Sequence, residues 1–231
     1  MSTPSVTERA KPSLPIGGVA LAGVLAIYAL WVLTVEFLRP AVSLDERFPP
    51  NISEPEQAAA RASATTAARV GMFRGDLWRD RALVDAALAF STLPSIDNAR
   101  IEGARSAALR AVSVAPIDAR AWLILAATAS SQSLASERIF EPLKMSYYTG
   151  PNERKLMDAR LRLAVRTRAF EQPELADAMR REIRAILRGA PELRAAILES
   201  YRQAGVSGRE FLLSAIAGID PEFEASLRSS G

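Results

Sequence analysis

Carboxylates are the side chains most able to do acid–base chemistry here, because the sequence contains neither histidine nor cysteine. Their absence excludes Ser-His-Asp and Cys-His nucleophiles and Cys/His zinc sites. Closely spaced carboxylates occur at Glu171 with Glu174, and at Asp220 with Glu222 and Glu224. Both groups stand at predicted helix starts, where capping and the helix dipole account for acidic residues. We therefore expect no enzyme, cofactor or metal site; a carboxylate-dependent enzyme acting on glycans is the weaker alternative.

Arginines form a second pattern. Residues 152–188 hold ten basic and six acidic residues, although the net charge of the whole chain, +3, is too small to indicate a nucleic-acid partner. Side chains four residues apart share a helix face, and a strip of guanidinium groups suits acidic lipids, glycans or carboxylate-rich proteins. The alternative is a solvated face with internal pairs such as Asp177–Arg181. The predicted strip consists of Arg162, Arg166, Arg180, Arg184 and Arg188.

An apolar segment near the N-terminus precedes all of these side chains in the sequence. Residues 16–35 carry no charge, and twenty helical residues span a hydrocarbon core of about 30 Å. We predict a transmembrane helix over residues 14–38, contacting the lipid bilayer. The alternative is a signal peptide cleaved near Ala20–Ala22. Arg9 and Lys11 before the helix favour a cytoplasmic N-terminus and a periplasmic main domain, at a bacterial inner membrane.

Small residues recur every four positions within this segment, at Gly18, Ala22 and Ala26. Such spacing lets two membrane helices approach closely, as in a homodimer. Ordinary membrane-helix composition is the simpler explanation of the same pattern.

The rest of the chain predicts helices and no sheet. Residues 1–13 form a tail, 39–55 a proline-rich spacer and 56–231 an all-α domain. Capping boxes are expected at Ser53 with Glu56 and at Ser207 with Glu210, because each pair has the Ser-x-x-Glu spacing. Asp76, Asp97 and Asp118 are expected to cap further helices. The predicted helices cover about 53–70, 77–92, 97–114, 118–130, 135–148, 152–170, 173–188, 191–204, 208–217 and 221–228.

One stretch, residues 104–126, resembles the junction between two tetratricopeptide repeats. Small residues fill the second helix of one repeat, a proline marks the turn, and a large residue begins the next helix. Ala108 and Ala129 depart from the pattern where aromatics are usual, and Met157 replaces the large aromatic one repeat later. The match is best over residues 76–170. The residues that carry the resemblance are Ala104, Ala108, Ala111, Pro116, Trp122, Leu125 and Ala126.

The resemblance implies a solenoid of helical hairpins, the alternative being a generic helical bundle. The layout is similar to that of single-pass bacterial envelope proteins with a tetratricopeptide-like domain, some of which accompany polysaccharide-export or secretion machinery. We expect a membrane-anchored scaffold or adaptor that binds a protein partner at the cell envelope. A structural accessory subunit of a larger membrane complex is the main alternative.

Overall fold

A computed structural model describes residues 16–39, 54–91, 97–132 and 135–230. The chain divides into two compact units, Met1–Leu38 and Arg39–Gly231. All regular elements among the described residues are helices, so the all-α prediction is confirmed. The predicted tail, most of the spacer, and the cap at Ser53 lie outside the described residues.

The first unit contains α1, Ile16–Phe37, whose 22 residues include one charged side chain, Glu36. At 1.5 Å per residue the helix is about 33 Å long, enough to cross a hydrocarbon core. Its composition and length therefore permit a membrane span. Gly18, Ala22 and Ala26 are all exposed along it.

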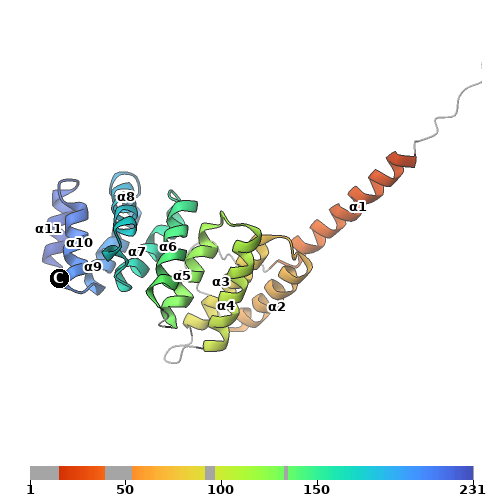
Figure 1. Ribbon diagram of the computed structural model, residues 1–231, viewed down its shortest axis with the longest axis horizontal. Coiled ribbons are helices and arrows are strands. Elements are labelled where there is room, and N and C mark those ends of the chain that lie inside the picture. Colours follow the sequence, from red (N-terminus) through yellow and green to blue (C-terminus); the bar gives the residue numbers. More distant parts are fainter. Residues whose placement is uncertain (1–15, 40–53, 92–96, 133–134, 231) are drawn as a thin grey trace, which may run out of the picture. The chain divides into compact units, whose positions relative to one another are not determined.

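The second unit is a succession of short helices joined by turns (Figure 1). Two single-turn 3-10 helices, η1 (Ala169–Glu171) and η2 (Pro191–Leu193), precede α8 and α9 respectively. The α-helices are α2 (Glu54–Val70), α3 (Gly75–Ser91), α4 (Asn98–Val114), α5 (Ala119–Ser131), α6 (Ser136–Thr149), α7 (Arg154–Arg166), α8 (Pro173–Gly189), α9 (Arg194–Gln203), α10 (Val206–Ile216) and α11 (Pro221–Ser229).

Local signals explain several of these helix starts. Asp97 accepts hydrogen bonds from the Ala99 and Arg100 amides, and Asp118 caps α5 in the same way. Two expected caps are wrong. Asp76 lies inside the first turn of α3, and α10 begins one residue before Ser207, with Gly205 at its N-cap and no side-chain cap.

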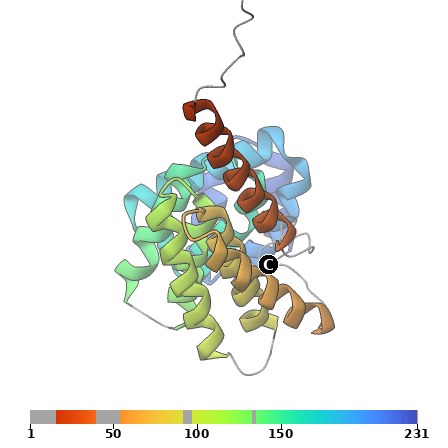
Figure 2. The ribbon, with the colours of Figure 1, turned by 90° about the vertical axis from the view of Figure 1, so that its right-hand side faces the viewer.

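Helices pack in sequence order, from α2 at one end of the unit to α11 at the other (Figures 1 and 2). Adjacent helices contact each other from α2 to α6, and the alternate helices α3, α5, α7 and α9 also contact one another in turn. The buried side chains form a cluster between α2 and α3, a second among α3, α4 and α5, and a third from α5 to α11. The core is thus a series of interfaces along the row.

Alanine determines how closely the early helices approach. Ala104, Ala108 and Ala111 of α4 are fully buried against α3 and α5. Glycine has the same effect at the start of α3, where a Cβ on Gly75 would lie 2.6 Å from the Ala115 Cβ. Side chains this small allow helix axes to come close, because little volume separates them.

Candidate functional site

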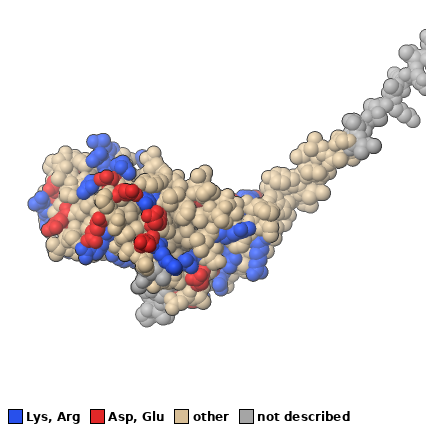
Figure 3. All heavy atoms as spheres, viewed as in Figure 1, with Lys and Arg blue, Asp and Glu red and all other residues tan. Residues whose placement is uncertain are grey.

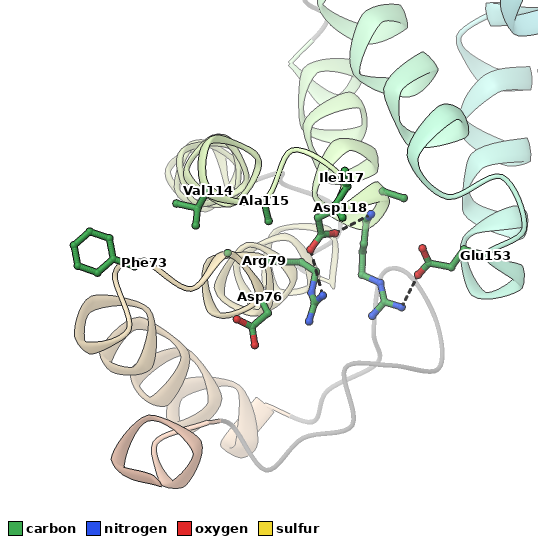
Figure 4. Close-up of a pocket in the computed structure, with 11 residues that line it drawn as sticks. Phe73, Asp76, Arg79, Val114, Ala115, Ile117, Asp118 and Glu153 are labelled. Carbon is green, nitrogen blue, oxygen red and sulfur yellow. Dashed lines mark hydrogen bonds and ion pairs between the residues drawn. The ribbon is translucent and has the colours of Figure 1, made fainter. Parts of the chain in front are cut away.

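One polar cluster lies at the turns that precede α3, α5 and α7 (Figure 4). An open cavity of about 650 Å³ separates these turns. Arg79 Nη1 lies 3.2 Å from Asp118 Oδ2, and Arg120 Nη2 lies 3.4 Å from Glu153 Oε1. We call this cavity the turn cavity. Its lining residues are Phe73, Gly75, Asp76, Arg79, Val114, Ala115, Ile117, Asp118, Ala119, Arg120 and Glu153.

Charges in the turn cavity neutralise one another. Burial would raise the pKa of Asp76, but a hydrogen bond and charge from Arg74, with the charges of Arg39 and Arg79, outweigh burial and lower it. Asp76 is therefore firmly ionised and already paired, at 2.7 Å from Arg74 Nη2. The cavity thus joins successive turns by ion pairs.

A second polar cluster is fully buried and centres on Arg160 of α7. The side chain is 0% exposed, and its guanidinium carbon lies 5.2 Å from the centroid of the Tyr147 ring. Its Nε donates to Ser146 Oγ at 3.0 Å, Nη2 to the Ser146 carbonyl at 2.6 Å and Nη1 to the Gly150 carbonyl at 2.9 Å. Glu182 of α8 accepts from Nη1 at 3.3 Å. The Arg160 side chain of α7 thus connects this helix to α6, to the turn after α6 and to α8.

Burial dominates the ionisation of this cluster. Burial raises the pKa of Glu182 to about 7, although the charge and hydrogen bond of Arg160 act in the opposite direction. Burial and then the negative charge of Glu182 raise the pKa of Tyr147 well above its usual range. The Tyr147 hydroxyl and Glu182 Oε1 are both buried, and a hydrogen bond between the two side chains also contributes to both pKa shifts.

The sign of the resulting pH dependence follows from proton binding. Between the unfolded pKa of 4.5 and the folded value of about 7, the folded chain holds a proton on Glu182 that the unfolded chain has lost. The free energy of unfolding therefore falls as the pH rises through this window. Glu182 behaves as a structural carboxyl that is most compatible with the fold when it is neutral.

A third feature is an open surface formed by α3, α5, α7 and α9, which we call the odd-helix face. A depression of about 290 Å³ opens on it, with a floor of buried apolar side chains. Arg162, Arg166 and Gln203 add polar groups to its lining. A second cavity, of about 350 Å³, lies between α7 and α9 and also contains Arg162. The lining of the depression is Phe90, Leu123, Ala127, Ala159, Arg162, Leu163, Arg166 and Gln203.

The predicted arginine strip is divided by the tertiary structure. Arg162 and Arg166 line the odd-helix face, whereas Arg180, Arg184 and Arg188 on α8 line none of the cavities described here. Arg180 pairs with Asp177 at 3.1 Å and lies 5.2 Å from the Phe211 ring centroid. The expected Asp177–Arg181 pair is therefore wrong by one residue. Acidic and basic side chains are interspersed over the C-terminal helices (Figure 3).

Four of the five closely spaced carboxylates have partners, and Glu222 lies in the first turn of α11. Glu224 Oε1 lies 2.7 Å from Arg228 Nη2. Glu171 pairs with Arg168, and Glu174 Oε2 lies 3.2 Å from Lys144 Nζ. Asp220 accepts from the Phe223 amide as a helix cap and lies 2.8 Å from Arg194 Nη2. Helix starts and ion pairs account for these residues. Among the described residues there is no group of three or more acidic side chains placed to hold a metal ion.

The residues that carry the repeat resemblance meet at α4 and α5. Leu125 and the partly buried Trp122 pack in the cluster shared by α3, α4 and α5, whereas Ala126 belongs to the cluster that extends toward α11. Trp122 Nε1 donates to the Pro116 carbonyl at 2.7 Å. Trp78, at the fourth position of α3, makes the same bond to the Met72 carbonyl, six residues earlier, at 3.1 Å. Met157 occupies the fourth position of α7.

Comparison of the chain with models of protein families, with curated proteins and with solved structures finds no match.

The buried Arg160 cluster is the feature that sequence reasoning missed. Arg160 lies in an arginine-rich segment, and its spacing does not distinguish it from its exposed neighbours. A signal exists, because Leu156, Leu161 and Leu163 surround it with apolar positions in one short helix. That pattern indicates a helix buried on most of its circumference, where a charged residue needs a partner.

Proposed function

We propose that the chain is a membrane-anchored helical-repeat adaptor that binds a segment of a protein partner on the odd-helix face. The observation that carries the proposal is the apolar depression bordered by Arg162 and Arg166. Its floor suits an apolar side chain of the partner. The arginines suit carboxylates beside that side chain, since guanidinium groups bind carboxylates strongly.

Arg166 is the cation best placed for such a contact. Its hydrogen bond within the described structure is a long one, 3.4 Å, to Ser130 Oγ, and it has no carboxylate within ion-pair distance there. Arg162 is held by Asp158 at 2.6 Å and remains 40% exposed. A partner carboxylate could therefore bind the Arg166 guanidinium group, which has no carboxylate partner among the described residues, and could share that of Arg162 with Asp158.

Repetition along the chain supports a tetratricopeptide-like solenoid as the scaffold. Two successive repeats would produce equivalent tryptophan–carbonyl bonds, as at Trp78 and Trp122, and the successive contacts of α3, α5, α7 and α9 would give such a solenoid a continuous inner face. The apolar α1 would place this face at a membrane. We further propose a bacterial inner membrane, with the second unit on the periplasmic side.

Crosslinking from the proposed surface tests the function. A photoreactive amino acid at Gln203, an exposed position in the depression, should crosslink a defined partner in intact cells. The same amino acid at Arg188, exposed on α8, is the matched control. Arg166→Glu should abolish the Gln203 crosslink while the melting temperature of the purified chain stays unchanged. Equal crosslinking from both positions, or no effect of Arg166→Glu, would refute binding at this face.

A subunit role carried by α1 is the second candidate, because its large side chains are mostly exposed, including Leu21, Val24 and Ile27. Exposed apolar surface of this extent requires cover by lipid or by other helices. Replacing residues 14–38 with an unrelated membrane helix separates the two candidates. Preserved cellular activity favours the adaptor, and lost activity with an intact second unit favours the subunit.

A further inference from the structure

A cavity beside the odd-helix face combines several features that bind anions. Its volume is about 660 Å³, within the range of small-molecule sites. It is formed by α7, η1, α9 and the start of α10, and we call it the α10 cavity. Its lining residues are Arg162, Val165, Arg166, Arg168, Phe170, Ser200, Gln203, Ala204, Gly205, Val206, Ser207, Gly208 and Glu210.

The first turn of α10 supplies backbone donors to this cavity. The first helical hydrogen bond is from the Arg209 amide to the Gly205 carbonyl, at 3.0 Å. The amides of Val206, Ser207 and Gly208 therefore have no acceptor within the helix, and no side chain caps them. The positive end of the helix dipole adds to these free N–H groups, which together favour an oxyanion.

Close packing brings this helix end against its neighbours. A Cβ on Gly208 would lie 3.1 Å from the Ala204 Cβ, 3.5 Å from Val165 Cγ1 and 3.6 Å from Phe170 Cε1. Glycine thus lets the first turn of α10 approach both α7 and η1. The free amides are consequently held beside the arginines at the end of α7.

Ser200 provides an observation independent of the helix end. The residue is 1% exposed and lines the α10 cavity. Its hydroxyl is buried and has no hydrogen-bond partner in the described structure. An unsatisfied buried hydroxyl is unfavourable, so a polar ligand atom that accepts from it would relieve that cost.

Charge in the cavity also favours an anion. Arg162 and Arg168 share their charges with Asp158 and Glu171, whereas Arg166 has no carboxylate partner among the described residues. Glu210 is the acidic residue of the lining and opposes binding from the second turn of α10. The charge of Arg166 balances that of Glu210, and the positive end of the α10 dipole then leaves the cavity favourable to an anion.

We propose that the α10 cavity binds the oxyanion group, phosphate or carboxylate, of a small molecule. The amides that begin α10, the Ser200 hydroxyl and the Arg166 guanidinium group donate hydrogen bonds to it. This site goes beyond the proposed function, because its ligand is a small anion and its backbone donors lie on α10. Arg162, Arg166 and Gln203 line both this cavity and the depression on the odd-helix face, so the two sites share one edge.

Titration calorimetry of the full chain in a non-ionic detergent tests this site. The probes are inorganic phosphate and glutarate, each compared with sodium chloride at equal ionic strength. We expect saturable binding of at least one probe at millimolar concentration, and the tighter one identifies the anion class. No saturable binding of either probe would overturn the proposal. No protein partner is present, so this outcome is separate from failure of the proposed function.

Val206→Pro is the decisive variant, because it removes one free amide without disturbing the helix. Proline is tolerated at the first helical position, and Gly205 already has the extended conformation, φ −69° and ψ 176°, that must precede it. Val206→Ala keeps the amide and is the matched control. Val206→Pro and Arg166→Gln should each weaken binding about ten-fold, since each removes a hydrogen bond to a charged group. Binding unchanged in both would show that the anion lies elsewhere.

Discussion

Replacing Arg160 with methionine should destabilise the second unit severely. Arg160→Met keeps most of the length of the side chain but removes its hydrogen bonds to the carbonyls of Ser146 and Gly150. It also leaves Glu182 without its cation, at 2% side-chain exposure. At pH 8, where Glu182 is ionised, removing one partner of this buried ion pair costs about 3–5 kcal/mol. For a unit of this size, 1 kcal/mol shifts Tm by about 2–4 °C, so the expected loss is about 6–20 °C.

Thermal unfolding of the full chain in detergent, followed by tryptophan fluorescence, measures this shift. Trp78 and Trp122 lie in the second unit and report its unfolding. Arg162→Met is the matched control, two residues further along α7. Arg162 is 40% exposed and pairs with Asp158 on its own helix, an arrangement worth less than about 1 kcal/mol.

Two results would refute the reasoning. If Arg160→Met unfolds within 2 °C of the wild type, the buried hydrogen bonds do not support the fold as the geometry indicates. If the two variants lose the same amount, burial of the guanidinium group is irrelevant and a general loss of arginine charge explains both shifts.

Three further variants test the same region. Glu182→Gln removes a carboxyl whose pKa in the folded chain is about 7. As the pH rises from 5 to 8, the free energy of unfolding of the wild type should fall by about 2–3 kcal/mol relative to this variant. Urea titrations measure both pH profiles, and parallel profiles would contradict the shift. Gly150→Ala would place a Cβ 2.7 Å from the Ala119 Cβ and should lower the free energy of unfolding by about 1–3 kcal/mol in the same titrations. Gly189→Ala is the control and should change it little, because the nearest atom to its Cβ, Arg154 Nη2, lies 3.9 Å away. Asp118→Ala removes the cap of α5 and should lower stability by about 1–2 kcal/mol; an unchanged melting temperature would mean that the cap is dispensable.

Much of the secondary structure could be predicted because its signals are local. Asp97 and Asp118 cap helices where their sequence positions indicate, and Pro173 and Pro221 occupy first turns. A capping side chain bonds to amides two or three residues away, so a short window of sequence contains both partners. The misplaced start of α10 shows the limit, since Ser207 and Glu210 match the capping-box spacing while the helix begins at Val206.

The sequence alone determined the helical class, the apolar N-terminal segment and the absence of cysteine and histidine chemistry. Tertiary structure decided which arginines act together. Spacing by four residues places Arg162 and Arg166 on one face of α7, but it does not say that α9 and α10 lie beside that face while Arg184 and Arg188 point elsewhere on α8. Spacing likewise cannot separate Arg160, buried with Glu182, from its exposed neighbours. Periodicity assigns a side chain to a face of its own helix, and only the packing of helices distant in sequence decides what that face meets.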